Sequence, residues 1–298
     1  MESFLNTVSR YGRTAIVVGS GNEGASGGHI SGTLKERITA RVELSVAPYE
    51  TGFSVQIWKA YTDRFAISLQ TPSGEVLGPI RERLGASRFQ WRTTWILVYY
   101  GQPNPYSLSQ EIYFDLIPDT GSYVESGIWT FLLVPEHLVE GRYDCWLPSA
   151  GTLNPSTRFL TAAPDTTLTI PSCAAGVITA GAYNSTSNAM ADFSGRGYTR
   201  LTNQIKPDLV APGVGLMAPA VGGGYLAVTG TSFAAPVVTG SAALMMQWGI
   251  VDGNDPYLYG EKLKACLHRG AKPLAGFDRY PNPVAGYGAL CLKNSLPI

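Results

Sequence analysis

Residues 228–236 read VTGTSFAAP, and residues 237–246 continue as the apolar run VVTGSAALMM. This alanine-rich run predicts a buried helix with Ser232 in its first turn. Backbone N–H groups lack partners there, and the helix dipole favours a developing negative charge. Pro236 is tolerated close to a helix start, because the N–H that it lacks has no partner there. On these residues alone, Ser232 is either a catalytic nucleophile positioned at the helix start or a serine that only caps the helix.

Composition restricts the classes of partner. The chain has 298 residues, of which 45% are hydrophobic, and its 22 basic side chains balance its 22 acidic ones. A net charge of zero gives no electrostatic reason to expect nucleic acid. No apolar run of membrane-spanning length and no secretory signal is evident, so we expect no membrane span, and the compartment stays open.

The sequence predicts neither a cofactor nor a metal. The four cysteines, at positions 145, 173, 266 and 291, form no CxxC pair. We expect buried free thiols, with no zinc site or disulfide framework. No acidic cluster has the spacing of a calcium-binding loop.

Two parts of the chain have α/β texture. A helix is predicted over residues 2–13, followed by a buried strand over 14–19 and the glycine-rich turn SGNEG at 20–24. Later come strands over 176–182 and 206–213, the helix of Ser232, and a helix over 256–269. Turns at the carboxyl ends of such strands are where α/β sheets place functional groups.

Between these parts the pattern alternates with a period of two, in strands of five to eight residues separated by turn signals. This pattern predicts an antiparallel β-sandwich or jelly roll. The predicted organisation is therefore an α/β core, residues 1–32 and 164–298, interrupted by a β domain over 33–163. Five of the six tryptophans fall in the insert, where they either fill the core, which we favour, or form a binding face: Trp58, Trp91, Trp95, Trp129 and Trp146.

A nucleophilic serine needs a base, a group that orients the base, and donors for the oxyanion. Asn22, in the glycine turn after a buried strand, can supply one donor beside the N–H of Ser232. The alternative is an asparagine that merely tolerates turn geometry.

These residues resemble the subtilisin-like serine proteases (subtilases, peptidase family S8). GTSFAAP at 230–236 is similar to the nucleophile motif, GNEG at 21–24 to the oxyanion-hole turn, and KPDLVAPG at 206–213 to a core strand. The resemblance covers residues 1–32 and about 164–298 and implies a mostly parallel sheet. It makes Ser232 the nucleophile of acyl-enzyme chemistry and Asn22 an oxyanion donor. Thr231 supports the turn, and Ser20 and Gly21 help to form the substrate pocket.

The insert and His29 narrow the resemblance to the Csp germination proteases of clostridia, which carry a jelly-roll insert. That resemblance implies a protein or peptide substrate, a cortex-lytic enzyme precursor, and a place in the spore. Subtilases place their triad aspartate and histidine before the asparagine turn, and neither motif occurs here. His29, His137, His268, Asp192 and Asp208 do not fit either role.

The sequence thus predicts the nucleophile part of a serine endopeptidase that is inactive alone. A gene fragment, or a chain needing a complementing N-terminal segment or propeptide, is favoured over a pseudoprotease. The alternative function is a non-catalytic scaffold or signalling protein that binds partners through its β-sandwich.

Overall fold

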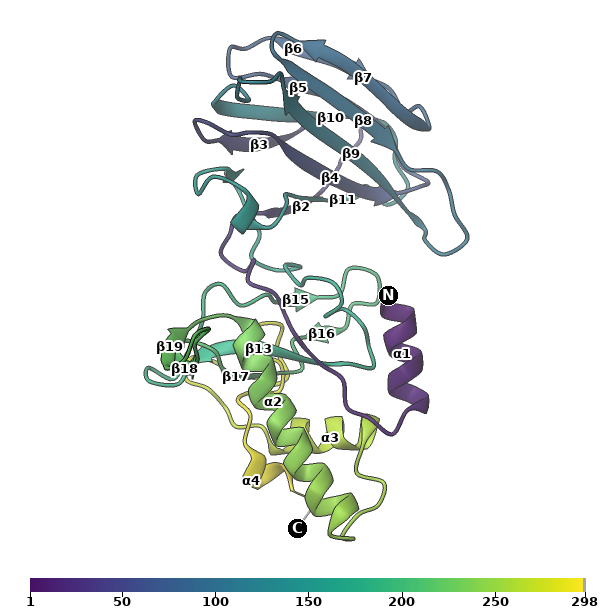
Figure 1. Cartoon of the computed structure of the whole chain (residues 1–298). Coiled ribbons are helices and arrows are strands. Elements are labelled where there is room, and N and C mark those ends of the chain that lie inside the picture. The colour runs from purple at the N-terminus through teal and green to yellow at the C-terminus, as the bar shows by residue number, and fades with distance from the viewer. Residues whose placement is uncertain (297–298) are drawn as a thin grey trace. The chain divides into compact units, whose positions relative to one another are not determined.

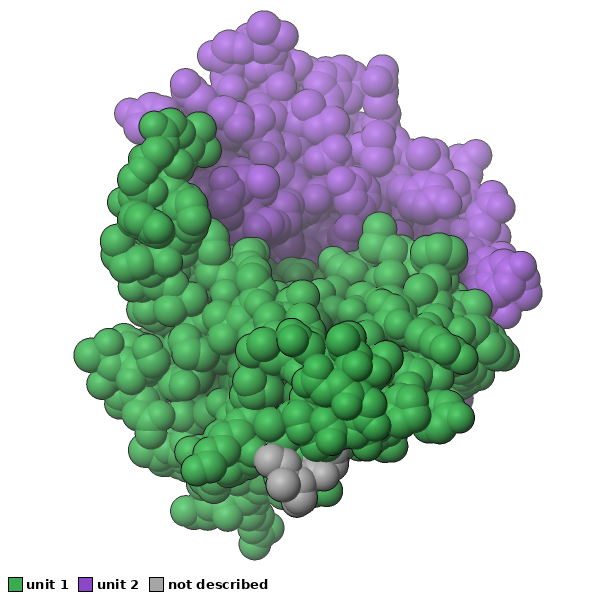
Figure 2. All heavy atoms as spheres, turned by 60° about the horizontal axis from the view of Figure 1, so that its bottom comes forward, with its two compact units in different colours: residues 1–25, 164–298 green, residues 26–163 purple. Residues whose placement is uncertain are grey.

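The computed structural model describes residues 1–296 and forms two compact units, coloured separately in Figure 2. The first unit contains Met1–Ala25 and the chain from Pro164 onward, and the second contains Ser26–Ala163. The sequence predicted a change of domain at residue 33. The second unit begins earlier because strand β2 (His29–Thr33) pairs with β11 (Arg142–Trp146) of the sandwich.

A parallel sheet organises the first unit (Figure 1). Strand β13 (Ile178–Asn184) lies at its centre, with parallel neighbours β1 (Val17–Gly19) and β17 (Leu209–Pro212). The short β14 (Ala189–Met190) pairs antiparallel with the end of β13. The carboxyl ends of three parallel strands therefore meet at one edge of this sheet.

Helix α2 (Thr231–Met246) contacts all three parallel strands, and its Ala234, Val238 and Ala242 are buried in their core. Helix α3 (Gly260–Gly270) contacts both α1 (Glu2–Tyr11) and α4 (Leu292–Ser295). The other elements of the unit are a π-helical turn and two small hairpins: Gln247–Val251, β15 (Gly197–Tyr198), β16 (Ile205–Lys206), β18 (Leu216–Pro219) and β19 (Tyr225–Val228).

The strand and helices of the first unit depart from the prediction in detail. The expected strand over 14–19 is shorter and only half-buried, because β1 is an edge strand of the described sheet. The helix predicted over 256–269 begins at Gly260, since Leu258 N–H donates to Asp255 O at 3.2 Å and closes a turn before it. The helix predicted over 2–13 ends at Tyr11.

Helix α2 and the π-helical turn run from Thr231 to Val251, 21 residues that contain an 18-residue window with mean hydropathy 1.3. Length and composition alone would let this helix cross a membrane, contrary to the prediction that no run was long enough. One such helix is weak grounds for a membrane span, because core helices pass the same test. Helices that are apolar all round normally lie inside a core, yet Leu244 is 55% exposed and Val251 77%. The helix is therefore only partly covered.

The second unit is an antiparallel sandwich of two sheets (Figure 1). The six-stranded sheet has the order β2-β11-β4-β9-β8-β7, and the five-stranded sheet has the order β12-β3-β10-β5-β6. A 3₁₀ turn at Ala150–Thr152 precedes the last strand. The remaining strands are β3 (Ala40–Val46), β4 (Phe53–Ala60), β5 (Arg64–Gln70), β6 (Val76–Ile80), β7 (Gly85–Trp91), β8 (Thr94–Tyr100), β9 (Ser109–Pro118), β10 (Gly127–His137) and β12 (Arg158–Phe159).

Alternate residues of the facing strands fill one core between the two sheets. Phe114 on β9 meets Phe131 on β10 edge to face, with ring centroids 5.2 Å apart. Of the five tryptophans in the insert, Trp129 and Trp91 lie in this core, and Trp58, Trp95 and Trp146 are half-buried. The prediction that tryptophans fill the core is therefore right for two of them.

The two ends of the sandwich unit are held together by its own hydrogen bonds. Phe159 N–H donates to Gly27 O at 2.9 Å, and Ala163 N–H donates to His29 O at 2.8 Å. The segment that enters the unit and the segment that leaves it therefore run side by side.

The separate core predicts that residues 26–163 fold when expressed alone and that Trp129 is a main contributor. Trp129 is fully buried, its Nε1–H donates to Glu125 O at 2.8 Å, and it packs edge to face on Trp91. We expect Trp129→Ala to lower the free energy of unfolding by about 3–5 kcal/mol, measured by urea denaturation of residues 26–163. Ile128→Ala, at an exposed neighbour on the same strand, is the control and should cost well under about 1 kcal/mol. Equal losses would contradict this account.

Candidate active site

The asparagine turn meets the start of α2 through Thr231. Asn22 follows the carboxyl end of β1, and its Oδ1 accepts hydrogen bonds from Thr231 N–H at 3.0 Å and Thr231 Oγ1 at 3.1 Å. Gly21 N–H in turn donates to Thr231 Oγ1 at 3.2 Å. These bonds fix the orientation of the Asn22 amide and leave its Nδ2 as the free donor end.

Two glycines make this close approach possible. Gly21 has φ +101°, a conformation that residues with a Cβ rarely adopt. A Cβ on Gly19, at the end of β1, would lie 3.0 Å from both O and Oγ1 of Thr231. The sequence GSGN at 19–22 therefore lets the strand end pack directly against the nucleophile turn.

Ser232 is exposed at the second position of α2, behind the N-cap Gly230. The next two N–H groups, of Phe233 and Ala234, donate to Gly230 O at 3.1 and 3.4 Å. Within residues 1–296, neither Ser232 Oγ nor its N–H makes a hydrogen bond. Ser232 N–H and Asn22 Nδ2 are therefore two donors without a partner among the described residues, at the contact between the asparagine turn and the start of α2, and donors of this kind are what the predicted oxyanion hole requires.

The asparagine turn is also held by backbone hydrogen bonds to residues that follow the insert. Gly195 N–H donates to Gly21 O at 2.8 Å, Gly24 N–H donates to Phe193 O at 2.9 Å, and Thr169 N–H donates to Ser20 O at 3.1 Å. Sequence reasoning missed this support, since these partners lie roughly 150–175 positions away along the chain. The only local feature that marks this region in the sequence is a polar loop that follows the strand predicted over 176–182.

Ser20 lies in the same turn but points inward. Its side chain is fully buried, with Oγ 3.5 Å from Ser194 Oγ. The prediction that Ser20 and Gly21 line a substrate pocket therefore concerns their backbone groups and remains a prediction.

Two of the three histidines belong to the sandwich unit, and the third lies on α3 of the first unit. His29 belongs to β2 of the sandwich unit, where its buried Nε2 lies 3.2 Å from Asp144 Oδ1 and its ring stacks on Trp146. His137 is exposed at the end of β10. His268, on α3, stacks on Tyr287 with ring centroids 3.9 Å apart. Among residues 1–296, no group of three His, Cys, Asp or Glu side chains is placed to hold a metal ion, and the four cysteines are unpaired.

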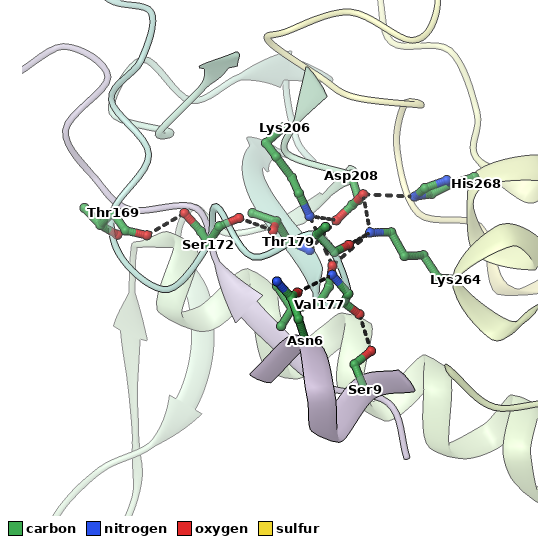
Figure 3. A network of polar contacts seen from close by, with 12 residues as sticks. Asn6, Ser9, Thr169, Ser172, Val177, Thr179, Lys206, Asp208, Lys264 and His268 are labelled. Atoms are coloured by element: carbon green, nitrogen blue, oxygen red, sulfur yellow. Dashed lines mark hydrogen bonds and ion pairs between the residues drawn. The ribbon is translucent and has the colours of Figure 1, made fainter. Parts of the chain in front are cut away.

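Asp208 is the centre of a buried ionic network (Figure 3). Its Oδ2 accepts from Lys206 Nζ and from Thr179 N–H, each at 2.7 Å, and its Oδ1 lies 2.9 Å from Lys264 Nζ and 3.3 Å from His268 Nε2. Both lysines also donate to Val177 O. The carboxylate is thus fully engaged in holding α3 to the sheet.

The topology of the sheet separates this network from Ser232. Asp208 precedes β17, whereas Gly213 follows it and accepts the N–H of Gly230 at 2.9 Å. At about 3.3 Å per strand residue, the two ends of this segment are roughly 16 Å apart. His268 and Asp208 therefore lie at the amino edge of the sheet, away from Ser232, and do not supply a base and carboxylate for it.

Burial shifts the pKa values of Lys206 and Asp208 in the direction that favours their uncharged forms. Desolvation lowers the pKa of Lys206 to about 8 despite the adjacent Asp208 carboxylate. Burial alone would raise the pKa of Asp208, but the hydrogen bond from His268 and the charges of Lys206 and Lys264 together hold it far below its usual range.

Lys206 therefore makes stability depend on alkaline pH. Between pH 8 and 10.5 the unfolded chain retains a proton that the folded chain has lost, so the unfolding free energy rises with pH, by at most about 1.4 kcal/mol per pH unit. We expect Lys206→Met to remove this rise, measured by urea unfolding at several pH values in that range. Lys262→Met, at an exposed lysine paired with Asp255, should keep it. A variant slope equal to that of the wild type would contradict the assignment.

Part of this chain is similar in sequence to known serine proteases. Residues 149–288 match the sequence profile of the subtilase family. Serine protease AprX of Bacillus subtilis is 32% identical over 155 residues, 45% of this chain and 33% of AprX. An intracellular serine protease of Paenibacillus polymyxa is 35% identical over 107 residues, 35% of this chain and 30% of that protein.

Among solved structures, the Clostridium perfringens CspB protease superposes with a TM-score of 0.89 at 36% identity, over 99% of this chain and 61% of the CspB chain. The chain therefore carries a domain of the subtilase family. Its fold is the mixed α/β fold of CspB with an antiparallel insert, as the sequence predicted. The chain spans about a third of AprX and of the P. polymyxa protease.

Proposed function

We propose that this chain is the nucleophile-bearing part of a subtilisin-type serine endopeptidase. Ser232 is the nucleophile, and Asn22 Nδ2 and Ser232 N–H are the oxyanion donors. The pair of hydrogen bonds from Thr231 to Asn22 Oδ1 carries this proposal, because it occupies the amide oxygen and leaves Nδ2 as a donor next to the residue that precedes Ser232. Thr231 is the positioning residue, and backbone groups of Ser20 and Gly21 line the pocket before the cut.

The chemistry follows from these roles. Ser232 Oγ bonds to the substrate carbonyl carbon while its proton passes to a base, and the two donors stabilise the resulting oxyanion. The C–N bond then breaks, the base returns the proton to the leaving amine, and an acyl-enzyme remains. Water repeats the sequence and frees Ser232. The substrate is a protein or peptide, and a role in spore germination rests on the Csp resemblance alone.

The base must come from outside the first unit, since its one histidine among the described residues is His268, which pairs with Asp208 at the amino edge of the sheet. We propose a complementing segment that carries the base and its carboxylate. Two features of the first unit favour its docking beside the site: the open edge of β1 and the exposed apolar side of α2. Edge strands and large apolar faces are usually covered in folded proteins. The chain alone is accordingly an inactive portion of the enzyme.

Co-expression with the polypeptide encoded upstream of Met1 tests the proposal. A fluorophosphonate probe should label the complemented protein at Ser232, and Ser232→Ala should not be labelled. Lack of labelling in a folded, complemented protein would favour the second candidate function, a non-catalytic scaffold or pseudoprotease. Upstream DNA without an in-frame aspartate and histidine motif would point the same way. The absence of a base beside Ser232 is the observation that keeps that candidate open.

A further inference from the structure

The outer face of the six-stranded sheet of the sandwich combines aromatic and acidic side chains. Along β9, burial alternates strictly: Ile112 and Phe114 are buried in the core, whereas Glu111, Tyr113 and Asp115 are half-buried. The last three therefore share the outward face of one strand.

Neighbouring strands place aromatic rings beside these carboxylates. Trp58 on β4 lies directly opposite Glu111, and Tyr99 on β8 lies directly opposite Tyr113. Both rings stand on the outward side of their strands, where they are partly exposed. Directly opposite residues in an antiparallel pair have Cβ atoms about 4.5–5.5 Å apart. We call Trp58, Tyr99, Glu111, Tyr113 and Asp115 the acidic ladder.

The two carboxylates of the acidic ladder lack a cation. In the described part of the chain, neither the Glu111 nor the Asp115 side chain makes an ion pair or a hydrogen bond. Partial burial raises the pKa of both. The nearby Arg88 is engaged elsewhere, with its guanidinium 4.6 Å above the Trp95 ring. A cation bound here would gain two carboxylates and the faces of aromatic rings, which attract positive charge.

We propose that the acidic ladder binds an extended basic segment of another polypeptide, with lysine or arginine side chains four residues apart. Glu111 and Asp115 are separated by four residues on one strand, which is about 13 Å. An extended segment repeats this spacing on one of its faces, so its two cations reach both carboxylates while the intervening side chain packs on Tyr113. Negative charge and exposed aromatic faces together favour this occupant over a neutral one.

Calorimetric titration of the full chain with synthetic peptides tests the proposal. The peptides are short, built of serine, threonine and valine, and carry two lysines. Lysines four residues apart should bind, and lysines three apart, on opposite faces of an extended peptide, should bind about tenfold more weakly or worse. Glutamates in place of the lysines should abolish binding, and added salt should weaken it.

Glu111→Gln with Asp115→Asn should weaken binding of the better peptide by about tenfold or more. Glu43→Gln with Glu136→Gln removes the same charge from β3 and β10 of the other sheet and should leave binding unchanged. Near-ultraviolet circular dichroism checks that each variant is folded, and the peptide series on the unaltered chain stands even if a variant is not. Indifference to lysine spacing, or an unaffected double variant, overturns the proposal. Binding of a neutral chito-oligosaccharide without binding of the peptide also overturns it, and makes the face a sugar platform.

Discussion

Ser232→Ala is expected to lower the kcat of the complemented protease by about 10⁶-fold. The loss is this large because the acyl-enzyme cannot form without Oγ, while the oxyanion donors and the substrate contacts remain. KM for a peptide substrate should change little. Ser241→Ala is a matched control on the same helix. Ser241 Oγ donates to Val237 O at 3.0 Å and has no proposed role in catalysis. A comparable loss in both variants would show that α2, rather than the hydroxyl, had been damaged.

The oxyanion role of Asn22 can be separated from its role in the turn. Asn22→Asp keeps an oxygen to accept from Thr231 N–H and Oγ1 but replaces the Nδ2 donor by a second oxygen. We expect kcat to fall by at least about 10²–10³, with thermal stability kept. Asn22→Ala should lose both activity and stability, because Thr231 then loses its acceptor. An active aspartate variant would contradict the assignment of Asn22 as a donor.

Asp208→Asn is expected to lower the unfolding free energy of the first unit by about 3–5 kcal/mol, because Lys206 and Lys264 would lose their counter-charge. Each lysine would then either stay charged in a buried site or give up a proton that the unfolded chain keeps, and both outcomes cost folding free energy. Thermal and urea denaturation measure the loss. Asp192→Asn, at an exposed turn residue, is the matched control and should fall within about 0.5 kcal/mol of the wild type.

Acid should reduce the difference between Asp208→Asn and the wild type. The folded state depresses the pKa of Asp208, so its contribution is complete above its unfolded pKa of about 3.9 and is lost as pH falls further. A difference that stayed constant to low pH would mean that the charge of Asp208 contributes nothing. Replacing Lys206 by Met in the Asp208→Asn chain should restore part of the stability, since one uncompensated charge is removed.

The features that the sequence predicted correctly are those that local patterns of residues determine. The asparagine turn and the nucleophile helix were predicted because glycine spacing and an apolar run act within a few residues of Asn22 and Ser232. The strand period of two likewise predicted the sandwich. The pairing of strands that lie far apart in the sequence produces no local pattern of this kind. His29 lies in β2, and no local pattern predicted this strand because its partner strand β11 is more than 100 residues away.

The Asp208 network shows the same limit. The motif around Asp208 was recognised as structural, but nothing in the sequence indicated that Lys264 and His268 on α3 would be its partners. The half-buried state of β1 was also missed, since an apolar strand has the same composition at an edge as in the middle of a sheet.

The hydrogen bonds that join the two ends of the sandwich have a consequence for the order of folding. Asn22 and Ser232 come from opposite sides of the insert and are 210 positions apart along the chain. Their meeting while the insert is unfolded closes a loop of that length, and the length-dependent entropy of that closure is roughly 5 kcal/mol. Once the sandwich has formed, the bonds from Phe159 to Gly27 and from Ala163 to His29 hold the chain ends together. The asparagine turn before the insert and the segment that follows the insert are then close together before they pack. The folded insert thus holds the two flanking segments together, and we infer that Ser232 meets Asn22 after the sandwich has folded.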